Sequence, residues 1–137
     1  MSDDADVDID VHDCTRCPAL CDNRSRIVNG VGPVDADLCF VGEGPGERED
    51  EQGEPFVGRS GEVLDDALRD RGRSRRDVRI VNCVRCRPPD NRDPHSEELA
   101  NCRPYLEREI DLADPELIVT LGKVPAQHLL ERGLCPA

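Results

Sequence analysis

Carboxylates, glycines and one aromatic ring are concentrated between residues 42 and 61. Glu43, Glu49 and Phe56 lie among glycines that include Gly42, Gly44 and Gly46. The apolar stretch 37–41 comes directly before this segment and predicts a buried strand. A glycine-rich strand exit that holds carboxylates and a flat ring is typical of a pocket for a small molecule or a nucleobase.

Two phosphate-binding interpretations of this segment are weak. A P-loop requires Gly-Lys followed by Ser or Thr, and the segment has no lysine. A dinucleotide fingerprint requires Gly-x-Gly-x-x-Gly that runs directly into a helix, whereas here the next helix is expected only near Ser60. A structural turn with a buried Phe56 explains the run as well as a base pocket does, when the run is taken alone.

Cysteines suggest a second site. Cys14-x-x-Cys17 places two thiolates on one turn, which can chelate one metal ion or one edge of a cluster. Cys86 and Cys102 could complete a set of four if the N-terminal loop folds back onto them, and Cys21 could compete. Four thiolates fit zinc as well as iron-sulfur, so the metal stays open. We assign no ligand role to the remaining cysteines: Cys39, expected in the core, Cys83 and Cys135.

Polar residues outside these segments are fewer. Asn82 ends an apolar strand and could read a ligand edge that presents one donor and one acceptor, or it could be a satisfied strand-end amide. The three histidines, His12, His95 and His128, are expected on the surface.

Composition limits the function classes. The 137 residues carry a formal net charge of −12, which argues against binding through phosphates alone, although arginines cluster between residues 73 and 92. No stretch is long and apolar enough for a membrane span, and no signal peptide is evident, so we expect a cytoplasmic monomer with reduced cysteines. The acidic, lysine-poor composition suits a salt-rich cytosol, which we treat as a hypothesis.

Strand and helix patterns alternate along the chain. Residues 1–13 are expected to be a disordered acidic tail, and residues 14–137 a single domain. Strands are predicted at 37–41, 78–84 and 117–121. Helices are predicted after Ser60, after Ser96 and from 124 to 132, with an extended proline loop at 88–94. These patterns indicate an α/β fold, a three-layer α/β/α sandwich with a parallel central sheet that is incomplete at its C-terminal end.

Taken together, the motifs resemble those of the family 4 (iron-sulfur) uracil-DNA glycosylases, in a form similar to haloarchaeal members. The resemblance covers nearly the whole chain from Cys14 onward. It rests on Gly-Glu-Gly-Pro-Gly at 42–46, Gly-x-Pro-Phe-Val-Gly-Arg-Ser-Gly at 53–61, and Asn-x-x-x-Cys-Arg-Pro-Pro-x-Asn-Arg at 82–92, together with the cysteines.

The resemblance implies a role in base-excision repair, in which uracil is flipped out of DNA and its N-glycosidic bond is hydrolysed to leave an abasic site. Phe56 would stack on uracil, and Asn82 would bind N3 and O4. Glu43 and the 42–46 loop would hold uracil and water, and Glu49 would close the side that rejects thymine. A 4Fe-4S cluster, or alternatively zinc, would be bound by the cysteines Cys14, Cys17, Cys86 and Cys102.

Two features depart from that family. Its His-Pro motif near the C-terminus is absent up to Ala137, and His128 does not match it. Loss of such a donor is typically worth about a hundredfold in rate. Cys21 is an additional cysteine in the ligand loop. The alternative to a uracil-DNA glycosylase is therefore a non-catalytic or weakly active iron-sulfur module that binds nucleic acid.

Overall fold

The computed structural model describes residues 10–131. Most of the predicted acidic tail and Cys135 thus lie outside the described residues, although Val11 is buried and exchanges two hydrogen bonds with Asn29. Ten elements follow in chain order: α1 (Pro18–Asn23), β1 (Leu38–Gly42), α2 (Glu47–Gln52), α3 (Arg59–Asp70), η2 (Arg75–Asp77), β2 (Arg79–Asn82), η3 (Pro89–Asn91), α4 (Ser96–Ala113), β3 (Leu117–Thr120) and α5 (Lys123–Glu131).

The described strands form one parallel sheet in the order β2-β1-β3, so the predicted sheet is confirmed. Each strand is followed by a helix that returns the chain to the other end of the sheet, which parallel pairing requires. The register pairs Gly42 of β1 with Asn82 of β2. The last residues of these two strands therefore lie side by side.

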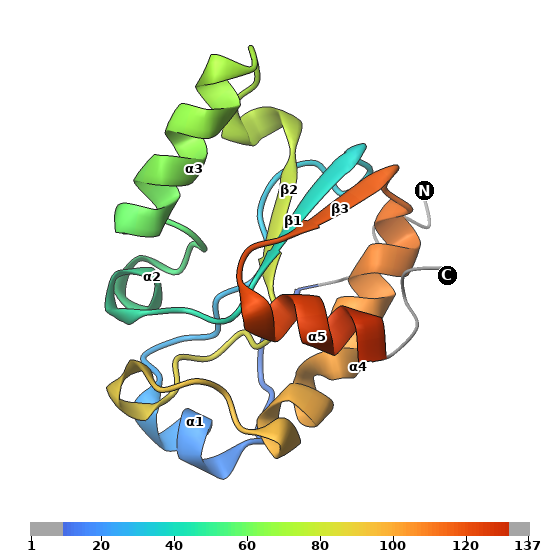
Figure 1. The fold of residues 1–137 in the computed structure, drawn as a ribbon. Coiled ribbons are helices and arrows are strands. Elements are labelled where there is room, and N and C mark those ends of the chain that lie inside the picture. Colours follow the sequence, from blue (N-terminus) through green and yellow to red (C-terminus); the bar gives the residue numbers. More distant parts are fainter. Residues whose placement is uncertain (1–9, 132–137) are drawn as a thin grey trace, which may run out of the picture.

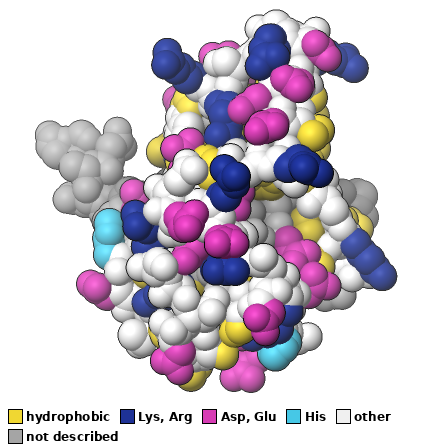
Figure 2. Space-filling model, turned by 90° about the vertical axis from the view of Figure 1, so that its left-hand side faces the viewer, with side chains coloured by type: hydrophobic (Ala, Val, Ile, Leu, Met, Phe, Trp, Pro, Cys, Tyr) yellow, Lys and Arg dark blue, Asp and Glu magenta, His cyan; other side chains and the backbone are white. Residues whose placement is uncertain are grey.

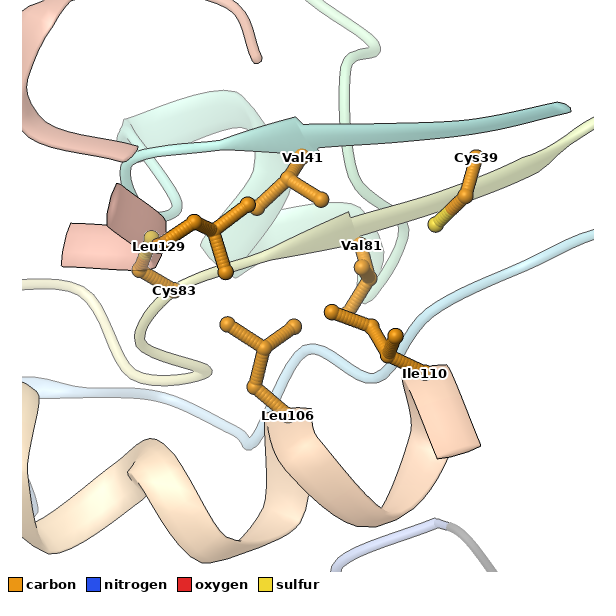
Figure 3. Packing of buried hydrophobic residues seen from close by; sticks show 7 residues of the cluster. All are labelled: Cys39, Val41, Val81, Cys83, Leu106, Ile110 and Leu129. Atoms are coloured by element: carbon orange, nitrogen blue, oxygen red, sulfur yellow. The ribbon is translucent and has the colours of Figure 1, made fainter. Parts of the chain in front are cut away.

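Helices cover both faces of the sheet, which gives the expected three layers (Figure 1). On one face, Leu64 and Leu68 of α3 pack against Phe40, Val78 and Ile80. On the other face, Figure 3 shows Leu106 and Ile110 of α4 below the strand residues Cys39, Val41 and Val81. Leu129 of α5 and Cys83, which follows β2, belong to the same cluster. Because helices cover both faces, the central residues of β1 and β2 are apolar and buried in succession: Cys39, Phe40 and Val41, and Ile80 and Val81.

A buried ionic group connects β2 to α4. Glu109, 1% exposed, accepts hydrogen bonds from Arg79 Nε at 2.6 Å and Arg85 Nη2 at 2.5 Å. Arg85 also donates to Asn29 Oδ1, which accepts from Val11. Three distant parts of the chain therefore meet at one carboxylate, and each buried charge has a partner of opposite sign.

Helix ends differ from the prediction by one or two residues. The N-cap positions of α3 and α4 are Gly58 and His95, not Ser60 and Ser96. In both cases a glutamate from outside the cap position accepts the free backbone N–H: Glu49 for Gly58 and Glu98 for His95. A carboxylate therefore binds the N–H of the residue that precedes each helix, from the neighbouring helix α2 at Gly58 and from the first turn of α4 itself at His95.

Two short elements were not predicted. Residues 47–52 form helix α2, whose first-turn acids complement the helix dipole and which ends at Gly53 with a φ of 78°. The proline loop is not fully extended either. Its centre is the 3-10 turn η3, where Asp90 and Asn91 both have a φ of 56°. Asp and Asn tolerate that left-handed backbone better than most residues do.

Only a narrow stripe of α3 faces the sheet: Gly61, Leu64 and Leu68 are buried, whereas Val63 and Ala67 are exposed. The predicted surface position is wrong for one of the three histidines. His128 is 3% exposed and not on the surface, since it shares the inward face of α5 with Leu129 and contacts Arg103 of α4. His12 and His95 are exposed as predicted.

Candidate functional site: a base-sized pocket and a cysteine cavity

A pocket of about 290 Å³ opens where β1 and β2 end. This is the carboxyl edge of a parallel sheet, where open α/β folds place ligands. Its volume is close to the lower end of the range of small-molecule sites, roughly 300 Å³. Six of the residues singled out from the sequence line it together with Ser60 and Leu121: Glu43, Gly44, Gly46, Glu49, Phe56 and Asn82.

Asn82 offers an unused acceptor inside this pocket. The residue is 3% exposed, and its Oδ1 has no hydrogen-bond partner among the described residues. An unpaired buried acceptor costs about 1–3 kcal/mol, so it is rarely left without a reason. A ligand N–H that reached this oxygen would remove that cost.

Phe56 is held beside Asn82 by glycines. A Cβ at Gly42 would lie 2.5 Å from the Phe56 ring and 2.6 Å from Asn82 Oδ1, so only glycine leaves space for both groups. Phe56 itself has a φ of 57°. A residue other than glycine in such a sparsely populated conformation costs about 1–3 kcal/mol. The surrounding chain therefore forces the ring into this position.

Glu49 joins the two loops that flank the pocket. Its Oε1 accepts from the Gly46 N–H at 3.0 Å, and its Oε2 accepts from the N–H groups of Val57 and Gly58 at 3.1 Å. Both oxygens are thus occupied by backbone donors. Glu49 contributes a wall of the pocket by fixing the loops that form it.

Among the described carboxyl groups, Glu43 has the pKa that is shifted furthest from its ordinary value. Burial, a side-chain hydrogen bond with Asp93 and the charge of Asp93 raise the pKa of Glu43 from 4.5 to about 7. Two carboxyl groups that share a hydrogen bond cannot both be ionised without strong repulsion. Asp93 belongs to the proline loop, and the sequence analysis did not single it out.

The four predicted ligand cysteines line a second cavity together. Cys14 and Cys17 come from the N-terminal segment, Cys86 follows β2, and Cys102 lies on α4. Val11, Leu20, Ile27 and Tyr105 contribute apolar walls. The predicted return of the N-terminal loop onto α4 is therefore present. Cys39 and Cys83 are core residues, and Cys21 donates its S–H to the Cys14 carbonyl at 3.6 Å.

Polar groups from the chain already contact two of these sulfurs. Arg24 Nη1 donates to Cys86 Sγ at 3.0 Å, and Asn101 Nδ2 donates to Cys17 Sγ at 3.5 Å. Burial raises the pKa of the Cys102 thiol to about 12. Within residues 10–131, no three His, Cys, Asp or Glu side chains converge closely enough for one metal ion.

Several of the arginines between residues 73 and 92 form ion pairs within the fold. Arg79 and Arg85 are buried against Glu109, and Arg92 forms an ion pair with Glu98. Figure 2 views the molecule from its α2 and α3 side and shows positive and negative side chains interspersed there, without a continuous basic patch on the described part of that face. Among the described helices, none is long and apolar enough to cross a membrane.

Comparisons with known proteins give the family. The model of the uracil DNA glycosylase superfamily matches residues 29–135. The chain is 51% identical over 112 residues to the type-4 uracil-DNA glycosylase of Thermotoga maritima, covering 82% of this chain and 58% of that protein. It is 43% identical over 124 residues to the type-4 enzyme of Archaeoglobus fulgidus, covering 90% and 62%.

A type-5 uracil-DNA glycosylase of Pyrobaculum aerophilum is more distant, at 30% identity over 148 aligned residues, 86% of this chain and 65% of that protein. The chain thus spans about three fifths of the length of these curated relatives. Since the family model covers most of the chain, this protein belongs to the uracil DNA glycosylase superfamily.

Proposed function

We propose that this chain binds uracil flipped out of DNA and hydrolyses its N-glycosidic bond, as a type-4 uracil-DNA glycosylase in base-excision repair. The observation that carries the proposal is the buried, unpartnered Oδ1 of Asn82 beside the Phe56 ring. Asn82 Oδ1 would accept from uracil N3–H, and its Nδ2 would donate to uracil O4. Cytosine presents the opposite pattern at both positions and would be rejected.

The remaining pocket residues have matching roles. Phe56 would stack on the base, which pays for part of the unstacking from DNA. The Gly42, Gly44 and Gly46 backbone and the Glu43 carboxylate would hold uracil and the attacking water near the sugar. Bond cleavage places negative charge on the departing uracil, and donors fixed before the reaction stabilise that charge without reorganising. Glu49 would exclude thymine by keeping the pocket wall rigid.

We propose that the cysteine cavity holds a 4Fe-4S cluster through Cys14, Cys17, Cys86 and Cys102. The proposal is supported by the lining of one cavity by all four residues, and by Arg24 and Asn101, which donate to two of their sulfurs. The cluster would fix the segment after β2, which carries Cys86 and continues into the proline loop, so its role here is structural. Visible absorption and bound iron in anaerobically purified protein would support this assignment, whereas colourless protein with bound zinc would contradict it.

A direct assay tests the activity. The purified holoprotein is incubated with single- and double-stranded DNA that contains one uracil, and abasic sites are revealed by alkaline cleavage. We expect cleavage at uracil and none in matched DNA with thymine or cytosine. Binding to uracil DNA without abasic product would instead support the non-catalytic iron-sulfur module. Asn82→Ala serves as the control for a contaminating glycosylase.

A further inference from the structure

Arg75 contacts the backbone of the residue that supplies the pocket's ring. From the turn η2, its Nη2 donates to the carbonyl of Phe56 at 2.6 Å and to the carbonyl of Pro55 at 2.9 Å. It lines no part of the pocket itself. A guanidinium can approach both oxygens because successive carbonyls point to the same side when the backbone adopts the left-handed conformation of Phe56.

The Phe56 carbonyl has little room to move away from Arg75, because α3 packs closely against it. A Cβ at Gly61 would lie 1.9 Å from the Phe56 oxygen and 2.3 Å from its carbonyl carbon. The peptide is therefore clamped between the first turn of α3 and Arg75. Gly42 limits the ring from the other side. The direction of the ring depends on a strained backbone that only its neighbours maintain.

Carboxylates hold the Arg75 guanidinium in turn. Asp65 of α3 pairs with Nε at 2.9 Å, and Glu54 pairs with Nη1 at 3.4 Å. The side chain is 22% exposed. The planar guanidinium thus uses separate nitrogens for α3, for the loop before it and for the two carbonyls. A lysine ammonium is a point charge and cannot make all of these contacts at once.

We propose that Arg75 is a positioning residue for base stacking, which holds Phe56 in the conformation that places its ring against the flipped base. The flipped base in this inference rests on the proposed function, whereas the contacts of Arg75 do not. The exposed neighbour Arg76 contacts none of these groups through its side chain in any interaction observed here, and is the matched control.

Fluorine NMR can test this directly because the chain has only two phenylalanines, Phe40 and Phe56. The holoprotein is labelled with 4-fluorophenylalanine, Phe56→Leu assigns the signals, and free uracil is titrated. In Arg75→Gln we expect a displaced and broadened Phe56 signal before uracil is added, with about tenfold weaker uracil binding. Arg75→Lys should be intermediate, and Arg76→Gln should match the original chain.

The Phe40 signal separates positioning from general damage. Phe40 is buried in the core, so it should stay in place in every variant. An unchanged Phe56 signal in Arg75→Gln, or equal displacement of both signals, would overturn the proposal. If Arg75→Gln does not fold, Arg75→Lys decides, and an unchanged Phe56 signal with unchanged uracil affinity counts against it. If uracil moves neither signal in the original chain, the proposed function fails, while the ligand-free Phe56 signal still tests Arg75.

Discussion

The pocket and the cysteine cavity differ in what holds their functional groups in place. The chain itself fixes the pocket: Glu49 binds three backbone N–H groups, and Arg75 binds the Phe56 carbonyl. The cavity's four thiols come from three separate segments. Hydrogen bonds from side-chain nitrogens reach only two of them in the described interactions, at Cys17 and Cys86.

The pocket is therefore preorganised by contacts within the chain, whereas the cavity depends on bringing three segments together. A rigid pocket with one open acceptor can lose a functional group at little cost to folding, because few contacts within the protein depend on that group. The cavity brings distant segments together around thiols, so a bound cluster would supply free energy that the chain lacks there. Substitutions should therefore affect activity at the first site and assembly at the second.

The largest effect is expected where the two regions are joined. Glu109→Ala leaves Arg79 and Arg85 buried without their carboxylate. Arg79 begins the strand that ends at Asn82, and Arg85 directly precedes Cys86. We expect the free energy of unfolding to fall by about 3–5 kcal/mol. Denaturant unfolding followed by circular dichroism measures it, with exposed Asp111→Ala on the same helix as control. Equal stability of the two variants would mean that the regions do not depend on this group.

Asn82→Ala should separate activity from stability most clearly. Removing one preorganised polar partner typically lowers a rate by about 10²–10³. Because Oδ1 has no partner to lose, the free energy of unfolding should change little. Single-turnover uracil release and thermal unfolding are measured side by side. Asn101→Ala, at the cavity, should instead affect stability more than uracil release. A large loss of stability in Asn82→Ala would contradict a preformed pocket.

Arg24→Gln should act on the cavity alone. The donor to Cys86 Sγ is lost, and loss of a group that supports a metal ligand typically lowers affinity by about 10–100-fold. We expect faster loss of visible absorbance under a chelator, with unchanged binding of free uracil. Exposed Arg26→Gln is the control. Weaker uracil binding in proportion to cluster loss would show that the two regions are not independent.

The smallest effect concerns pH. Glu43 is neutral below a pKa of about 7, so a role for its carboxylate predicts activity that rises as the pH increases through 7. Asp93→Asn removes the neighbouring charge and should move that rise to lower pH.

The effect of Glu43 on stability has the opposite dependence on pH. The folded protein retains a proton that the unfolded chain releases near 4.5, so the free energy of unfolding falls as the pH rises from about 4.5 to above 7. A pH–rate profile that is the same in Asp93→Asn argues against the coupling.

Patterns local in sequence predicted most of the fold. The strands predicted at 37–41, 78–84 and 117–121 are present at 38–42, 79–82 and 117–120, and Leu106 and Ile110 of α4 pack on the same core as β1 and β2. Some errors occur where distant groups intervene. Glu49 binds the Gly58 N–H at the start of α3, and α4 buries His128. A single sequence carries no signal for such contacts, because each depends on how the layers pack. At α4 the contact is local, since Glu98 lies three residues after His95, whose N–H it binds.

By itself, the sequence determined which chemistry is possible: the glycine loop without a P-loop lysine, the amide at the end of a strand and the paired cysteines. Tertiary structure decided which of these groups act together. The Gly42–Asn82 register brings amide and ring into one pocket. Asp93 and Arg75 act on this pocket from outside, through Glu43 and the Phe56 carbonyl. Hydrogen bonds and carboxyl pKa values depend on distances in space and not on separation along the chain, so only the folded molecule specifies them.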